Sequence, residues 1–115
     1  MNIYNRELIL EEERKQNFSS LPSRLHSIWV CEEEQIEFWE KCLNGNTTLF
    51  RVQLNGDLFH SSYLFLPDEG LPANEIKEAA KKYWNPVFKT EEEIKKSEYL
   101  FQGEVKVLEI VKKAR

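Results

Sequence analysis

The stretch Tyr-Leu-Phe-Gln-Gly-Glu-Val-Lys-Val-Leu-Glu-Ile-Val, residues 99–111, decides the fold of this chain. Aromatic and β-branched residues dominate it, which is typical of β-strands. Because Gly103 divides it, we predict two strand segments, over residues 99–102 and 105–111. The second segment begins with alternating apolar and polar residues, which indicates that one of its faces is buried.

Similar patterns further upstream predict strands over residues 25–30, 48–54 and 58–66. The tripeptide Asn55-Gly56-Asp57 lies between the last two and carries the residue types of a tight turn. We therefore expect the chain to reverse there.

Helical spacing of apolar residues predicts helices over residues 5–16, 32–43 and 74–84. A short helical turn follows over residues 90–96, where Thr90 and Glu93 fit a capping box. The order of elements predicts one α+β domain, residues 1–115, with a small mixed or antiparallel sheet and flanking helices.

Two expectations concern packing. A charged helix as short as residues 5–16 is marginal on its own, so we expect Leu8 and Ile9 to pack on the sheet. We also expect the aromatic residues of the second and third helices to share one core; these are Phe38, Trp39, Tyr83 and Trp84.

Composition excludes several classes of protein. Sixteen basic against twenty acidic side chains give a net charge of −4, whereas a non-specific nucleic-acid binder normally presents a basic face. No window is long and apolar enough to span a bilayer, and the N-terminus lacks the apolar segment of a signal peptide. These patterns predict a cytoplasmic protein without a membrane partner.

The histidines and cysteines do not predict a metal site. His26, His60, Cys31 and Cys42 are widely spaced, with no Cys-x-x-Cys pair, so four zinc ligands cannot be assembled from them alone. We interpret both histidines as structural hydrogen-bonding residues and both cysteines as reduced thiols.

Two segments resemble the second half of the ADP-ribosyltransferase fold. In the first, Ser27-Ile28-Trp29-Val30 precedes a helix and then an apolar strand; in the second, Ser97-Glu98-Tyr99-Leu100-Phe101 follows a loop. The chain also resembles an uncharacterised bacterial family associated with that fold, through Leu21-Pro22-Ser23-Arg24-Leu25, Glu98-Tyr99-Leu100-Phe101 and Gly103-Glu104-Val105.

The resemblance implies transfer of ADP-ribose from NAD to a protein or nucleic-acid acceptor. It places Glu98 as the catalytic carboxylate, which would stabilise the oxocarbenium ion formed as nicotinamide leaves. Trp29 and Tyr99 would flank nicotinamide across one concave surface, and Ser27 and Arg24 would line the pocket. The Glu98 carboxylate is expected to be partly desolvated and without a cationic partner.

The chain departs from that family at its beginning. Transferases of this fold open with a strand whose His or Arg grips NAD, and no such strand precedes the helix at residues 5–16. Trp29 also stands where the family has Tyr, which keeps stacking but loses a hydroxyl. Whether the chain is an enzyme therefore stays open. The alternatives are a non-catalytic protein-binding module of the same architecture and a structural or phage-associated subunit.

Overall fold

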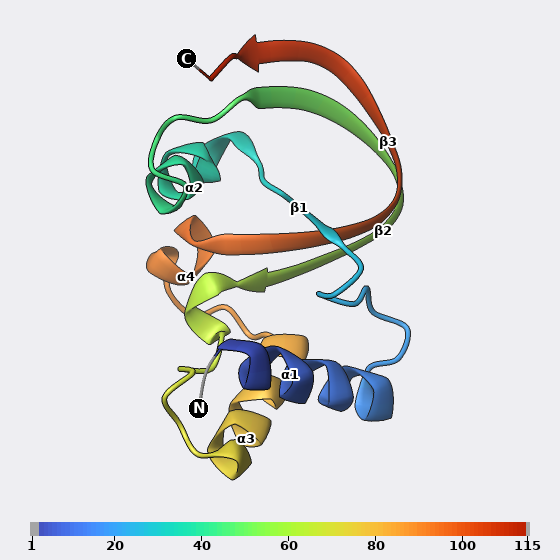
Figure 1. The fold of residues 1–115 in the computed structure, drawn as a ribbon, viewed down its shortest axis with the longest axis vertical. Coiled ribbons are helices and arrows are strands. Elements are labelled where there is room, and N and C mark those ends of the chain that lie inside the picture. The colour runs from blue at the N-terminus through green and yellow to red at the C-terminus, as the bar shows by residue number, and fades with distance from the viewer. Residues whose placement is uncertain (1–2, 115) are drawn as a thin grey trace.

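The protein is an α+β structure, as the order of predicted elements indicates. A computed structural model describes residues 3–114. The helices are α1 (Ile3–Asn17), η1 (Glu33–Gln35), α2 (Ile36–Cys42), η2 (Tyr63–Phe65), α3 (Ala73–Trp84) and α4 (Glu91–Lys95). The strands β1 (Ile28–Val30), β2 (Leu49–Ser62) and β3 (Ser97–Lys112) form one antiparallel sheet in the order β1-β3-β2 (Figure 1).

Strands β2 and β3 form a long ribbon that bends back on itself (Figure 1). Pairing runs from Ser62 opposite Ser97 to Leu49 opposite Lys112. Each strand is continuous, so the predicted reversal at Asn55-Gly56-Asp57 is wrong, as is the division of the last segment into two strands.

A pair of glycines explains the bend. Gly56 lies opposite Gly103, and a Cβ atom added to Gly56 would come 2.3 Å from the carbonyl oxygen of Gln102. One added to Gly103 would come 2.5 Å from the carbonyl oxygen of Asn55 and 3.0 Å from the Phe101 ring. Only glycine permits this close approach of the two strands beneath an aromatic ring. Gly56, which in the sequence is typical of a turn, is therefore needed because a side chain at this position would clash with the opposite strand.

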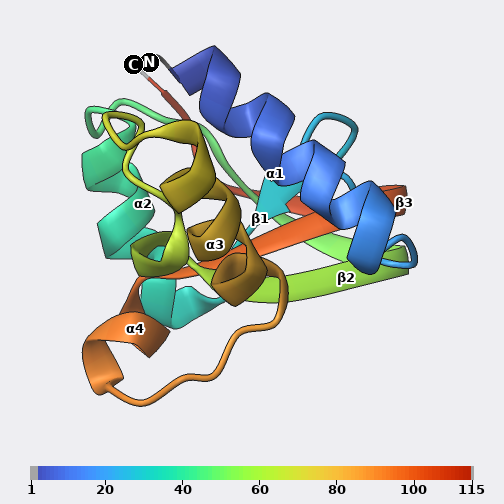
Figure 2. The same ribbon diagram turned by 90° about the horizontal axis from the view of Figure 1, so that it is seen from below.

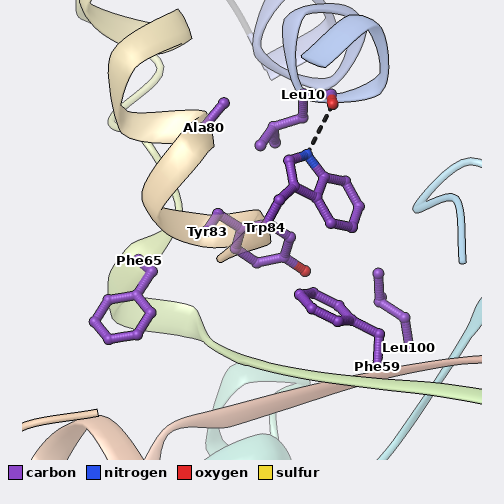
Figure 3. Close-up of a cluster of buried hydrophobic side chains, with 7 residues drawn as sticks. All are labelled: Leu10, Phe59, Phe65, Ala80, Tyr83, Trp84 and Leu100. Atoms are coloured by element: carbon purple, nitrogen blue, oxygen red, sulfur yellow. Dashed lines mark hydrogen bonds between the residues drawn. The ribbon is translucent and has the colours of Figure 1, made fainter. Parts of the chain in front are cut away.

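Helices α1 and α3 cover one face of the sheet below the bend (Figure 2). The buried core there consists of Leu10, Phe59, Phe65, Ala80, Tyr83, Trp84 and Leu100 (Figure 3). Leu10 of α1 belongs to this core, and the Trp84 indole donates a hydrogen bond to its carbonyl oxygen at 2.9 Å. Leu8 is exposed, so the expectation that Leu8 and Ile9 anchor this helix on the sheet is wrong; α1 packs mainly on α3.

Helix α2 lies on the opposite face. The Trp39 indole donates to the carbonyl oxygen of Ser97 at 3.1 Å, and the Phe38 ring packs edge-on against Tyr63. The predicted single aromatic core is therefore wrong, because Tyr83 and Trp84 are buried on the other side of the sheet. The reason is strand alternation, which gives each face of a sheet its own set of side chains.

Local signals set several element boundaries. The capping box predicted at α4 is confirmed: the Glu93 amide donates to Thr90 Oγ1 at 3.1 Å, and the Thr90 amide donates to Glu93 Oε1 at 3.0 Å. Helix α3 begins at Ala73 after Pro72, one residue before the predicted start. Strand β1 is shorter than predicted and begins at Ile28.

Candidate functional site

Glu98, the predicted catalytic carboxylate, lies at the start of β3 and points to the side of the sheet covered by α1 and α3. It is 2% exposed. Its Oε2 atom accepts hydrogen bonds from Arg24 Nη1 and from the Tyr83 hydroxyl, and the same guanidinium nitrogen also donates to the Tyr83 oxygen at 2.8 Å. One carboxylate oxygen is thus shared by a cation and a phenol in a closed, buried site.

Arg24 holds this network together. Its Nε and Nη2 atoms lie 2.9 Å and 2.8 Å from the two carboxylate oxygens of Glu7 on α1. Its guanidinium carbon lies 5.3 Å from the centre of the Trp29 ring and 5.2 Å from that of Tyr83, which are cation–π distances. Arg24 therefore joins α1, β1, α3 and β3 through one planar group.

The electrostatics of the network favour its charged, closed form. Burial by itself would lower the pKa of Arg24, but the hydrogen bond to Glu7 and the charges of Glu7 and Glu98 hold it above the ordinary value. Burial, together with the charge of Glu98, raises the pKa of Tyr83 well above its ordinary value. Tyr83 therefore stays a hydrogen-bond donor, and Arg24 stays a cation.

Arg24 contacts both Glu98 and Trp29, which the resemblance places with it around one pocket. The expected absence of a cationic partner is wrong, because Arg24 bonds the carboxylate directly. Glu7 and Tyr83 were missed as members of this site. Tyr83 had been assigned to the core by its helical spacing, and no local signal connects Glu7 with Arg24, seventeen residues away.

The side chains of Trp29 and Tyr99 lie on opposite faces of the sheet, although both residues line the groove described below. Trp29 pairs with Leu100, whereas Tyr99 pairs with Val30, so alternation points the two rings to opposite faces of the sheet. The Tyr99 ring stacks on His60 with 4.2 Å between centres, and its hydroxyl donates to Glu32 Oε1 at 2.5 Å. The two rings therefore do not face each other, as flanking one nicotinamide would require.

Burial sets the charge states around Tyr99. Desolvation lowers the pKa of His60, although the charge of Glu32 partly opposes this. Burial and the hydrogen bond to Glu32 raise the pKa of Tyr99. His60 Nε2 lies 2.8 Å from the Ser97 hydroxyl, which fits the structural role predicted for this histidine.

Ser27, the remaining predicted pocket residue, does not join the Glu98 network. Its hydroxyl oxygen is buried and has no hydrogen-bond partner among the residues described. Both cysteines are free thiols, and burial raises the pKa of Cys31. In residues 3–114 no group of three His, Cys, Asp or Glu side chains is arranged to hold a metal ion.

A large groove lies on the face of the sheet opposite the Glu98 network. Residues of β1, η1 and α2 line it, together with residues of the bent arm, which we define as residues 49–55 of β2 and 104–112 of β3. Its volume is about 890 Å³. Most of the side chains that line it are apolar, including Ile36, Trp39, Leu43, Val52, Leu54, Leu58, Val105, Val107 and Val111. Leu43, Leu58, Val105, Val107 and Val111 are at least two-fifths exposed. No sequence pattern indicates this groove, because it exists only through the bend at Gly56 and Gly103.

A family model described as "Protein of unknown function (DUF2441)" matches residues 1–113. The chain belongs to this family. A comparison with curated proteins finds no match. Among the helices described, none has the length and apolar character needed to cross a membrane.

Proposed function

We propose that this member of the DUF2441 family is a non-catalytic protein-binding module, and that its groove holds an apolar segment of a partner protein. The groove carries this proposal. Its floor and walls are aliphatic and aromatic side chains that remain substantially exposed, and contiguous exposed apolar surface of this kind marks interaction sites.

The bent arm of β2 and β3, which forms one wall of the groove, also supports partner binding. Beyond the glycine pair, β2 and β3 form a two-stranded ribbon on which Val107, Leu108, Ile110 and Val111 are all about half exposed. The pairs Val107-Leu108 and Ile110-Val111 break strict alternation, so apolar side chains lie on both faces of the ribbon. A two-stranded ribbon is also only marginally stable in water without a covering layer. A partner in the groove would supply one such layer.

Peptide selection tests this proposal. A phage-displayed library of random 12-residue peptides would be selected on the immobilised wild-type chain. Val107→Glu places a charge in the groove, and Leu108→Glu is its matched control, because Leu108 is equally exposed but does not line the groove. We expect peptides that bind wild type and Leu108→Glu but lose binding to Val107→Glu. Peptides that do not distinguish the two variants, or no retained peptides at all, would contradict the proposal.

A second proposal, NAD-dependent ADP-ribosyl transfer to a protein or nucleic acid, rests on the convergence of Glu98, Arg24 and Trp29. Glu98 is nearly fully buried, so it would reach the nicotinamide ribose only after Arg24 and Tyr83 release it. The test is NAD glycohydrolase activity at millimolar NAD. A preorganised charge of this kind contributes about a hundredfold to a thousandfold in rate, so Glu98→Gln should lose that much. Absence of both NAD binding and turnover in wild type would end this proposal.

A further inference from the structure

Strand β3 changes its place in the sheet along its length. Between Tyr99 and Phe101 it is the central strand, with β1 on one edge and β2 on the other. After Phe101 the pairing with β1 ends, while pairing with β2 continues to Lys112. Within the described part of the chain, no strand occupies the β1 side of β3 at residues 104–112. The backbone groups on that side form an open edge.

The open edge lies beside the groove. β1 and β3 both line the groove. The open edge of β3 begins just beyond the pair of Ile28 with Phe101, where β1 stops pairing with β3. Edge strands are commonly protected by short length, bulges or charge. Here a register shift opposite Arg51 and Val52 disturbs the later part of β3, whereas residues 104–107 keep a regular register with β2. The regular part is where a further strand can pair.

From these positions, and resting on the proposed function, we propose that the partner segment binds as an extended strand that pairs with residues 104–107 of β3 and carries basic side chains. Directly opposite residues of neighbouring strands point to the same face. Every second residue of the added strand would therefore enter the groove beside Val105 and Val107, which both line it. The partner segment must therefore carry an apolar residue at every second position, as in other cases of β-strand addition.

The charge of the groove decides which polar side chains of the partner can enter it beside the apolar ones. Among the described residues that line it, three carry carboxylates, Glu32, Glu33 and Glu40, and one, Arg51, carries a guanidinium. Glu40 is neutralised by Lys112 at 2.8 Å, so the acidic character of the groove comes from Glu33 and from Glu32, which accepts a hydrogen bond from Tyr99. Such an acidic wall attracts lysine and arginine and repels acidic residues.

The experiment uses the peptides retained by wild type in the library selection, made synthetically. Each is N-methylated in two versions, on one alternate set of amides or on the other, which blocks strand pairing along one edge while keeping every side chain. The loss of two backbone hydrogen bonds corresponds to about tenfold or more in Kd, so we expect one version to weaken by that factor and the other to bind nearly unchanged. Replacing the basic residues of the peptide with glutamate should also weaken binding.

The outcomes separate the two proposals. If both N-methylated versions bind as well as the parent, or both weaken equally, strand addition is overturned while groove binding stands. If the retained peptides carry no excess of basic residues and Glu33→Lys leaves their Kd unchanged, the basic partner is overturned. If no peptide distinguishes Val107→Glu from Leu108→Glu, the proposed function fails and this inference fails with it.

Discussion

The same two strands behave differently on the two sides of the glycine pair. Below Gly56 and Gly103, the strands lie between α1 and α3 on one face and α2 on the other, and Leu100 is fully buried. Above them, the strands carry an equally apolar sequence, yet Val107 is 55% exposed. Apolar content therefore does not determine burial in this protein. The helices cover one half of the ribbon and leave the apolar arm open.

The ion pairs show the same contrast. Arg24 and Glu98 meet below the bend with side chains 7% and 2% exposed, whereas Arg51 and Glu109 meet on the open arm at 2.6 Å with more than half of each side chain exposed. A buried charge that loses its partner pays a desolvation cost that an exposed charge avoids. The following four experiments test this contrast.

The largest effect is expected from Arg24→Met, which leaves the buried Glu98 without its cation. Removing one partner of a buried pair costs about 4 kcal/mol of unfolding free energy. Arg51→Met is the matched control and should change stability little, because exposed pairs contribute little. Urea unfolding of both variants measures the difference. Equal losses would show that burial does not separate the two pairs. The double variant Arg24→Met/Glu98→Gln should recover part of the loss, because it removes the unpaired charge.

The next largest difference in unfolding free energy is expected when one aliphatic side chain is shortened in each half of β3. Leu100→Ala removes methyl groups from the closed core and should cost about 3 kcal/mol through lost burial and an unfilled cavity. Val107→Ala on the open arm should change unfolding free energy by about 0.5 kcal/mol or less. Thermal unfolding of the isolated chain compares them. A large loss for Val107→Ala would indicate that the arm is already covered, for instance by self-association.

Gly103→Ala tests the junction between the two halves. The added methyl group would meet the Asn55 carbonyl oxygen at 2.5 Å, so the strands must separate, at a cost of about 2 kcal/mol. Gly70→Ala is the control, since its nearest neighbour is a side-chain oxygen of Asp68 at 3.4 Å. Chemical denaturation measures the loss. If both variants match wild type, close approach is not what keeps glycine at position 103.

The smallest effect concerns His60, whose pKa burial lowers below its ordinary value of about 6.5. The folded state then binds the proton less tightly than the unfolded state, so this contribution to stability is complete above about pH 6.5 and declines at lower pH. His60→Phe keeps a ring between Tyr99 and Phe88 but cannot titrate. We expect wild type to lose more stability than His60→Phe between pH 7.5 and 5.5, by less than about 1 kcal/mol. Parallel curves would contradict this.

Some of the structure follows from the sequence because its causes are local. The capping box of Thr90 and Glu93 spans four residues, and its hydrogen bonds form wherever the helix begins. The apolar spacing of α3 and the strand composition of β3 likewise reflect neighbouring positions, which is why the α+β class was predicted correctly. The contact between Glu98 and Arg24 was not predicted, because both were placed around one pocket but Glu98 was expected to lack a cationic partner.

Tertiary structure alone decided the rest. Alternation tells which residues of one strand share a face, but only register shows that Trp29 and Tyr99 face opposite ways. The sequence around Gly56 is typical of a turn. Only the structure shows that Gly56 lies opposite Gly103, where the two strands approach each other closely. Arg24 and Glu98 are 74 residues apart, so a contact that closes the predicted site depends on packing of α1, α3 and the sheet. The groove arises in the same way, because a bend in a paired ribbon is a property of two strands together and of neither sequence segment by itself.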